Sequence, residues 1–159
     1  MILFHGSILE IRQPDVAHSK ENLDFGKGFY LTTHLEQARR WARRKALRTG
    51  GKAIVNRYEL EDDLSDYKEL RFFSEDEDWV KFVCACRRGG KDYEKYDLII
   101  GGVADDKVFA AVDMYFRGIW DIDRTISELK FYKANDQICL VSQELIDQKL
   151  HFVVSEEVT

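Results

Sequence analysis

The chain is poor in the residues and runs that define several large classes of protein. It has one proline, two methionines and three cysteines among 159 residues. A small, odd number of cysteines does not make a disulfide framework, so we expect free thiols and a reducing compartment, the cytoplasm. No run approaches the roughly 18 apolar residues of a membrane span, and residues 1–7 lack the basic segment and cleavage site of a signal peptide. We therefore expect no membrane association.

Several motifs of catalysis and metal binding are also missing. The sequence has no phosphate loop of the Walker type, no nucleophile elbow and no zinc-protease helix motif, which argues against those enzyme classes. Cys84 and Cys86 have no second pair at zinc-binding spacing, and His18, His34 and His151 are scattered along the chain. We expect no metal site.

The residues that are present favour one globular domain. Hydrophobic residues make up 45% of the chain and aromatic residues 13%, which is enough for one sizeable core, and no linker or repeat divides residues 1–159. Periods of two and of 3.6 residues alternate, so the fold class is α+β with interleaved elements. The predicted strands are 1–7, 29–32, 53–60, 96–100, 137–141 and 152–154, and the predicted helices are 33–49, 74–89, 105–115, 124–132 and 142–150.

Three of the predicted helices have clear start signals. Thr33 with Glu36 and Ser74 with Glu77 have the spacing of a capping box, and Asp105 or Asp106 is suited to cap the next helix. Capping explains these two aspartates more simply than a metal or acid–base pair does. The acidic segment before Ser74 is predicted to be a loop.

Charge is strongly segregated although the net charge is only −5. A basic block occupies residues 39–52, and an acidic block follows from residue 59 to residue 78. Arg40, Arg44 and Arg48 recur at i, i+4 and i+8, so they form one basic stripe on the predicted helix. Two interpretations stay open: solvated faces, or a contact to phosphate groups of a bound nucleotide or of nucleic acid.

A glycine loop between residues 24 and 28 leads directly into a strand. Gly26 and Gly28 are expected to permit a positive φ and the close approach of a ligand. In the strand that follows, Tyr30 and Thr32 point to the same side. A plain hairpin entry is the alternative interpretation of this segment.

Three polar residues on predicted strands are candidates for chemistry. His5 precedes Gly6 on the first strand, Tyr30 follows the glycine loop, and Gln137 opens an otherwise apolar strand. Taken singly, each has a structural explanation: a hydrogen-bonded histidine, a packed tyrosine or a polar strand end. Their order and surroundings carry more information than any one of them.

Together with their flanking residues, these positions resemble an uncharacterised bacterial family placed in the ADP-ribosyltransferase superfamily. The resemblance covers nearly the whole chain, and its motifs are specific as a set. They are Phe4-His5-Gly6-Ser7, the segment Asp24 to Thr33, the segment Tyr96 to Asp106 that contains Ile-Gly-Gly-Val-Ala-Asp-Asp, and Asp136-Gln137-Ile138-Cys139. The resemblance implies a split antiparallel β-sheet core with flanking helices and an NAD-binding cleft between its halves.

The same resemblance implies roles for individual residues. His5, Tyr30 and Gln137 would form the catalytic triad: His5 bonds a ribose of NAD, Tyr30 stacks on the nicotinamide ring, and Gln137 holds the ribose 2′-hydroxyl. The backbone of Gly6 would read the nicotinamide amide. The implied set for binding the cofactor NAD, as ADP-ribose donor, is His5, Gly6, Ser7, Gly26, Lys27, Gly28, Tyr30 and Thr32.

Gln137 departs from the commonest triad, which has glutamate there. A neutral amide accepts from a hydroxyl but brings no negative charge to the cationic transition state, and such electrostatic contributions reach about 3 to 4 kcal/mol. Asp136 points to the opposite strand face, so it does not replace the missing carboxylate. The resemblance implies transfer of ADP-ribose to a protein or nucleic acid, as in a bacterial toxin of a toxin–antitoxin or phage-defence system restrained by a small antitoxin-like protein. The alternatives are a catalytically silent module binding NAD, ADP-ribose or a nucleotide, and an interaction protein with a vestigial site.

Overall fold

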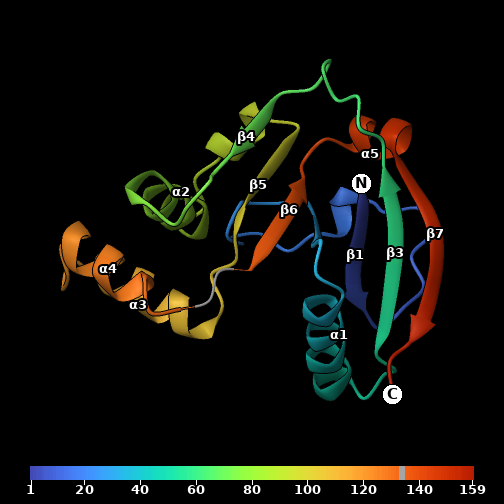
Figure 1. Cartoon of the computed structure of the whole chain (residues 1–159), viewed down its shortest axis with the longest axis horizontal. Helices are drawn as coiled ribbons and strands as arrows, with labels where there is room; N and C mark the ends of the chain where they lie inside the picture. The colour runs from blue at the N-terminus through green and yellow to red at the C-terminus, as the bar shows by residue number, and fades with distance from the viewer. Residues whose placement is uncertain (133–134) are drawn as a thin grey trace.

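The computed structural model describes residues 1–132 and 135–159, which form two sheets flanked by helices (Figure 1). In chain order the strands are β1 (Ile2–Ser7), β2 (Phe29–Leu31), β3 (Ile54–Leu60), β4 (Glu69–Arg71), β5 (Leu98–Gly102), β6 (Asp136–Leu140) and β7 (Leu150–Glu157). The helices are α1 (Leu35–Thr49), α2 (Glu77–Arg87), α3 (Asp106–Phe116), α4 (Ile122–Leu129) and α5 (Gln143–Lys149). Short 3₁₀ turns cover Val16–His18 and Asp92–Lys95.

The predicted α+β class and the division of the sheet are confirmed. The first sheet has the order β1-β3-β7 and is antiparallel throughout, and the second has the order β2-β6-β5-β4. An antiparallel bridge between Phe4 and Thr32 joins β1 to the end of β2 and so connects the two sheets. One strand departs from the prediction. The acidic segment that was predicted to be a loop contains β4, which pairs in parallel with β5. The second sheet is therefore mixed.

The helix caps confirm some start signals and correct others. Asp105 caps α3 through Val108 N at 3.0 Å, as predicted, and Ser142, at the start of the predicted last helix, caps α5 through Leu145 N at 3.2 Å. The prediction that Ser74 caps α2 is wrong, because Asp76 accepts from Trp79 N at 3.1 Å.

The predicted cap of α1 at Thr33 is also wrong. The N-cap position is His34, whose side chain makes no capping bond, and Thr33 donates instead to the carboxylate of Asp136. Asp136 lies far along the sequence, so local spacing could not indicate this competition. At the other end Gly50, with φ 74°, ends α1 as predicted.

Three apolar clusters hold the elements together. The largest packs α2, α3 and α4 against one face of the second sheet and includes Phe25, Trp79 and Cys139. A second fills the space between the sheets, and a small third cluster joins α1 to β1 and β3. All three cysteines are buried free thiols. Within the described residues, no helix has the length and apolarity that crossing a bilayer requires.

Candidate functional site

The candidate site lies at the connection between the sheets, where β1, β2 and β6 meet. His5 is on β1, Tyr30 on β2 and Gln137 on β6. Tyr30 pairs with Cys139 across the β2–β6 ladder, so Gln137, two residues before Cys139, faces the same side of the sheet as Tyr30. The fold thus brings the three candidates onto adjacent strands.

His5 is tied to Tyr30 through the backbone. Its Nδ1 lies 2.6 Å from the Tyr30 carbonyl oxygen, and because that oxygen only accepts, Nδ1 carries the hydrogen and Nε2 is an acceptor. The ring stacks on Phe29 with 4.4 Å between centroids. Burial, and next the positive charge of Lys45, lower the pKa of His5 to about 3, although the bond to Tyr30 opposes the shift. His5 is therefore a neutral ring in a fixed tautomer at physiological pH.

Tyr30 uses its hydroxyl inside the glycine loop. The hydroxyl donates to the Gly26 carbonyl at 2.5 Å and accepts from Phe25 N at 3.0 Å. The ring packs, partly exposed, against the largest apolar cluster, and burial raises the pKa of Tyr30 well above its ordinary value. The hydroxyl therefore fixes the loop, while a stacking role for the exposed part of the ring stays a prediction.

Gln137 is 3% exposed, and its amide has one defined orientation. The Nε2 group donates to Asp24 Oδ2 at 2.9 Å and to the Gly102 carbonyl at 3.1 Å. Both amide hydrogens are used in this way, which leaves Oε1 as an acceptor. Any bond from Gln137 to a ligand hydroxyl would therefore involve Oε1.

Asp24 is the residue of this region that the sequence did not single out. It is 6% exposed and accepts four hydrogen bonds, two from the Arg87 guanidinium, one from Ala104 N at 3.0 Å and one from Gln137. A buried carboxylate is tolerated when it is paired and hydrogen-bonded in this manner. The only available signal was its position at the start of the glycine loop.

The two loop glycines differ in their reason for being glycine. Gly26 has φ 77° as predicted, but Gly28 does not have a positive φ, so that part of the prediction is wrong. A Cβ at Gly26 would collide with the ring of Tyr93, and one at Gly28 would collide with Cys139. The space beside both glycines is thus filled by the protein's own side chains.

Gly6 lies directly under α1. A Cβ there would overlap the backbone of the helix at Ala38, and the Gly6 carbonyl accepts from Lys45 Nζ at 2.6 Å. Burial, followed by the positive charges of Arg48 and Lys20, lowers the pKa of Lys45 to about 8. A ligand that read the Gly6 carbonyl would have to replace this ammonium group.

The remaining residues of the predicted set have mainly structural contacts. Ser7 is buried and accepts weakly from Leu9 N at 3.4 Å, while Thr32 donates to Asp136 Oδ1 at 2.7 Å. Lys27 is half-buried in the loop. Asp136 accepts from the hydroxyl groups of Thr32 and its neighbour, and that it does not serve as the missing carboxylate stays a prediction. Within the described residues, no cluster of three or more potential ligand side chains is placed to hold a metal ion.

Fold and site together define an α+β domain with a split sheet and a candidate polar site at the split, where His5, Tyr30 and Gln137 are accompanied by the Asp24–Arg87 ion pair and Lys45. The match to a family model of proteins of unknown function, DUF3990, spans residues 1–152, so the chain belongs to that family. No curated protein and no solved structure matches the chain.

Proposed function

We propose that the protein binds NAD at the connection between its sheets and acts as an ADP-ribosyltransferase-like enzyme. The observation that carries the proposal is a pair of neutral acceptors of fixed orientation: Nε2 of His5 on β1 and Oε1 of Gln137 on β6. These strands flank β2, where His5 stacks on Phe29 and Gln137 lies on the side of Tyr30, and both acceptors suit ribose hydroxyl groups. The resemblance of the motifs to the ADP-ribosyltransferase superfamily adds the chemical class.

In the proposed reaction the glycosidic bond to nicotinamide ionises before the acceptor attacks. His5 would orient one ribose through a hydroxyl, and Gln137 would accept from the 2′-hydroxyl of the other. Nicotinamide leaves with the bonding electrons, and the acceptor nucleophile forms the new bond at C1′ and loses a proton. The protein would orient the reacting groups and would place no charged side chain beside the reacting carbon.

Labelled NAD tests the proposal directly. Purified protein is incubated with lysate and NAD labelled in the adenylate part, and free nicotinamide is measured in parallel. We expect label in macromolecules and a loss of label in His5→Ala, whereas the matched control His18→Ala, in an exposed turn, keeps it. Absence of both label and nicotinamide would refute the transferase.

A second candidate is a module that binds NAD without cleaving it. It is favoured by the engagement of Gln137 with the buried Asp24, which leaves the site without a free carboxylate. Calorimetry separates the two, since NAD binding with no nicotinamide release supports the module. Unchanged thermal stability over an NAD titration would favour a vestigial site in an interaction protein.

The proposal extends to a cytoplasmic toxin that a small antitoxin-like protein restrains, in a toxin–antitoxin or phage-defence system. Three buried free thiols suit that compartment. Expression in a bacterium should then arrest growth with the wild type and not with His5→Ala. Harmless expression of a folded, soluble wild type would contradict the toxin role.

A further inference from the structure

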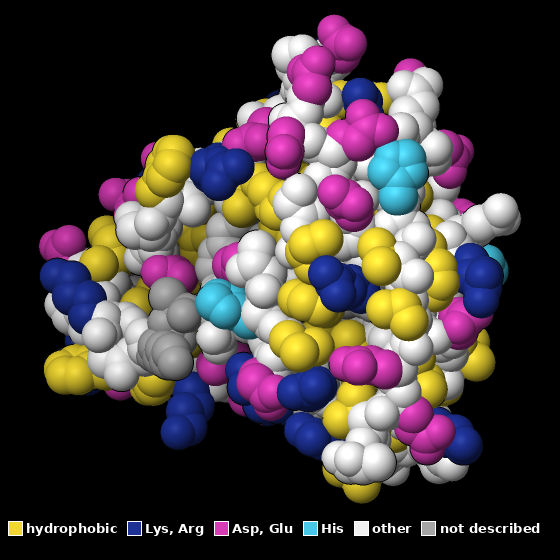
Figure 2. All heavy atoms as spheres, turned by 45° about the vertical axis from the view of Figure 1, so that its right-hand side comes forward, with side chains coloured by type: hydrophobic (Ala, Val, Ile, Leu, Met, Phe, Trp, Pro, Cys, Tyr) yellow, Lys and Arg dark blue, Asp and Glu magenta, His cyan; other side chains and the backbone are white. Residues whose placement is uncertain are grey.

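Helix α1 concentrates positive charge in an otherwise acidic protein. It contains six of the 24 Lys and Arg residues and one of the 29 acidic residues. Figure 2 shows Lys and Arg side chains gathered over the region of this helix. Since α1 packs on β1 at Gly6, this charge lies directly beside the candidate site.

The outward stripe of α1 is largely free of opposing charge. Arg40, Arg44 and Arg48 are all exposed, and the ion pair found for them among the described residues joins Arg44 to Asp106 at 4.0 Å. Arg39, in contrast, pairs with Glu36 and with Glu156. The stripe is about 12 Å long at the rise of an α-helix, which is longer than a single diphosphate group.

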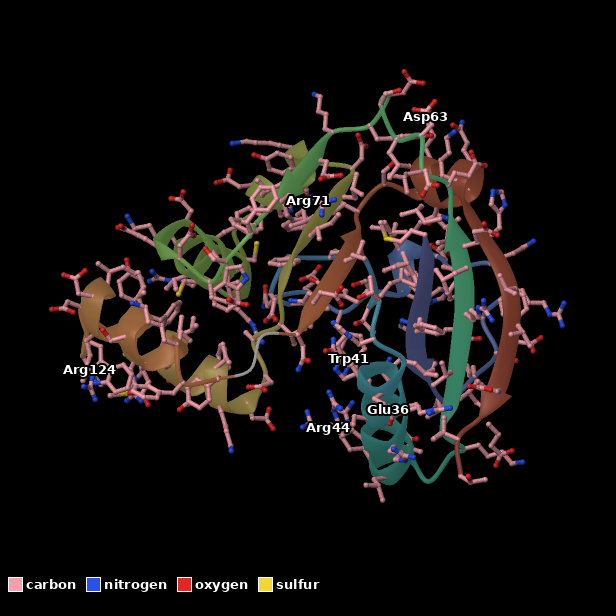
Figure 3. The ribbon with its side chains drawn as sticks, viewed as in Figure 1. Glu36, Trp41, Arg44, Asp63, Arg71 and Arg124 are labelled. Carbon is pink, nitrogen blue, oxygen red and sulfur yellow. The ribbon has the colours of Figure 1, made fainter. Side chains whose placement is uncertain are left out.

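Trp41 interrupts this basic surface with an aromatic ring. It is half-buried, and it belongs to none of the three apolar clusters formed by the described residues. A Cβ at Gly6 would meet the Cβ of Trp41 at 2.9 Å, so Trp41 is anchored over β1 at Gly6. Figure 3 shows Trp41 and Arg44 on the same side of α1, the side turned toward β6.

One further cation, Lys45, extends the surface toward the site. It reaches the Gly6 carbonyl at 2.6 Å, and burial, followed by the charges of Arg48 and Lys20, lowers its pKa. Like charges such as these repel one another. A polyanion bound here would be attracted by all of them, and it would relieve that repulsion.

We propose that this surface, Arg40, Trp41, Arg44 and Arg48, binds single-stranded nucleic acid. The arginines contact successive phosphates, and Trp41 offers a face on which an unpaired base stacks. A duplex hides its base faces, so it can use only the charges. That the bound strand accepts ADP-ribose rests on the proposed function. That the strand binds to this surface does not.

Binding is measured by fluorescence anisotropy without NAD, with labelled 20-nucleotide mixed-sequence DNA, RNA and duplex DNA. We expect the single strands to bind more tightly than the duplex, and the two single-stranded arms to distinguish DNA from RNA. The triple variant R40E/R44E/R48E should weaken binding about tenfold or more and flatten the logarithmic salt dependence by about 2. Trp41→Ala should weaken it about 5- to 150-fold, whereas Trp41→Phe should retain most of it.

The matched control reverses three exposed lysines on α2 and the turn after it, K81E/K91E/K95E. It changes the net charge of the protein equally but leaves α1 intact, so it should keep binding. Circular dichroism and thermal melting check that every variant folds. Equal loss in this control, preference for the duplex, or no binding at 50 mM salt would overturn the proposal.

A second readout separates this inference from the proposed function. The same oligonucleotides are incubated with labelled NAD and analysed for transferred label. Label on the strand supports it as the acceptor. Binding without label leaves the binding surface standing but refutes nucleic acid as the acceptor, and label on protein alone does the same.

Discussion

The substitution Gln137→Glu is the sharpest probe of the site, because it installs the carboxylate that the proposed ADP-ribosyltransferase activity would commonly use. In the structure the amide nitrogen of Gln137 donates to Asp24 at 2.9 Å and to the Gly102 carbonyl at 3.1 Å. An ionised glutamate has no hydrogen to donate, so both acceptors would lose their partner. We therefore expect a loss of stability, without a gain of NAD turnover.

The expected loss of stability equals the cost of the cheaper of two states of the new side chain, ionised or protonated. Two unit charges 2.9 Å apart repel by about 6 kcal/mol at an effective dielectric constant of about 20. Arg87 offsets part of this repulsion, but burying a second ionised carboxylate adds a desolvation penalty of several kcal/mol. Keeping the new carboxyl protonated costs about 1.4 kcal/mol for each pH unit above the ordinary glutamate pKa of about 4.3. That is about 2 kcal/mol at pH 6 and about 5 kcal/mol at pH 8, so the neutral acid prevails.

The pH dependence gives this prediction its test. The pKa of the new carboxyl is raised in the folded state, so its stability deficit is smallest below about pH 4.3 and grows as pH rises. Urea unfolding at pH 6 and pH 8 should give deficits that differ by about 3 kcal/mol. Gln13→Glu, the same change on an exposed loop, is the control and should show no such difference. A variant as stable as the wild type at both pH values, or one that cleaves NAD faster, would refute the reasoning.

Three further predictions test the surroundings of the site. Arg87→Ala leaves the Asp24 carboxylate buried without its cation, and urea unfolding should show about 3 kcal/mol less stability. Gly26→Ala should lower the melting temperature more than Gly118→Ala: both have a positive φ, 77° and 73°, but only Gly26 has an aromatic ring in the way. The ring signals of His5 should not titrate by NMR between pH 5 and pH 8, because burial and a nearby lysine lower its pKa to about 3.

Each of these has a clear contrary result. An Arg87→Ala variant as stable as the wild type would mean that Asp24 does not depend on the guanidinium. Equal melting temperatures for the two glycine variants would mean that the ring beside Gly26 moves away freely. A titration of His5 in the measured range would contradict the lowered pKa. Because unfolded histidine binds a proton near pH 6.5, His5 should also make the protein less stable as pH falls below that value.

Much of the fold was predictable because its elements have regular apolar periods. The strands holding His5, Tyr30 and Gln137 were all predicted. Strand β4 was missed because its residues are mostly charged, and its pairing with β5 depends on main-chain bonds that side-chain patterns do not report. In general, the sequence did not predict which strands pair when the partners lie far apart along the chain.

The residues of the candidate site could be predicted from the sequence, but their hydrogen-bond and ion-pair partners could not. The sequence singled out His5, Tyr30 and Gln137, but not the carboxylate that orients the last of them. Asp24 is 113 residues from Gln137 and is buried with Arg87, and no local pattern predicts a buried ion pair. The same reason applies to Thr33, which spacing assigns to a helix cap and the structure assigns to a strand carboxylate.

The connection between Asp24 and Gln137 also bears on how fast the proposed reaction would be. A negative charge lies within 2.9 Å of the Gln137 amide, but the guanidinium of Arg87 is bonded to the same carboxylate and offsets that charge. A cationic transition state would therefore meet two neutral acceptors backed by a compensated ion pair. Without the roughly 3 to 4 kcal/mol that a direct charge contributes, turnover should be about 10²- to 10³-fold slower than with a free carboxylate. Binding of NAD should accordingly be easier to detect than its cleavage.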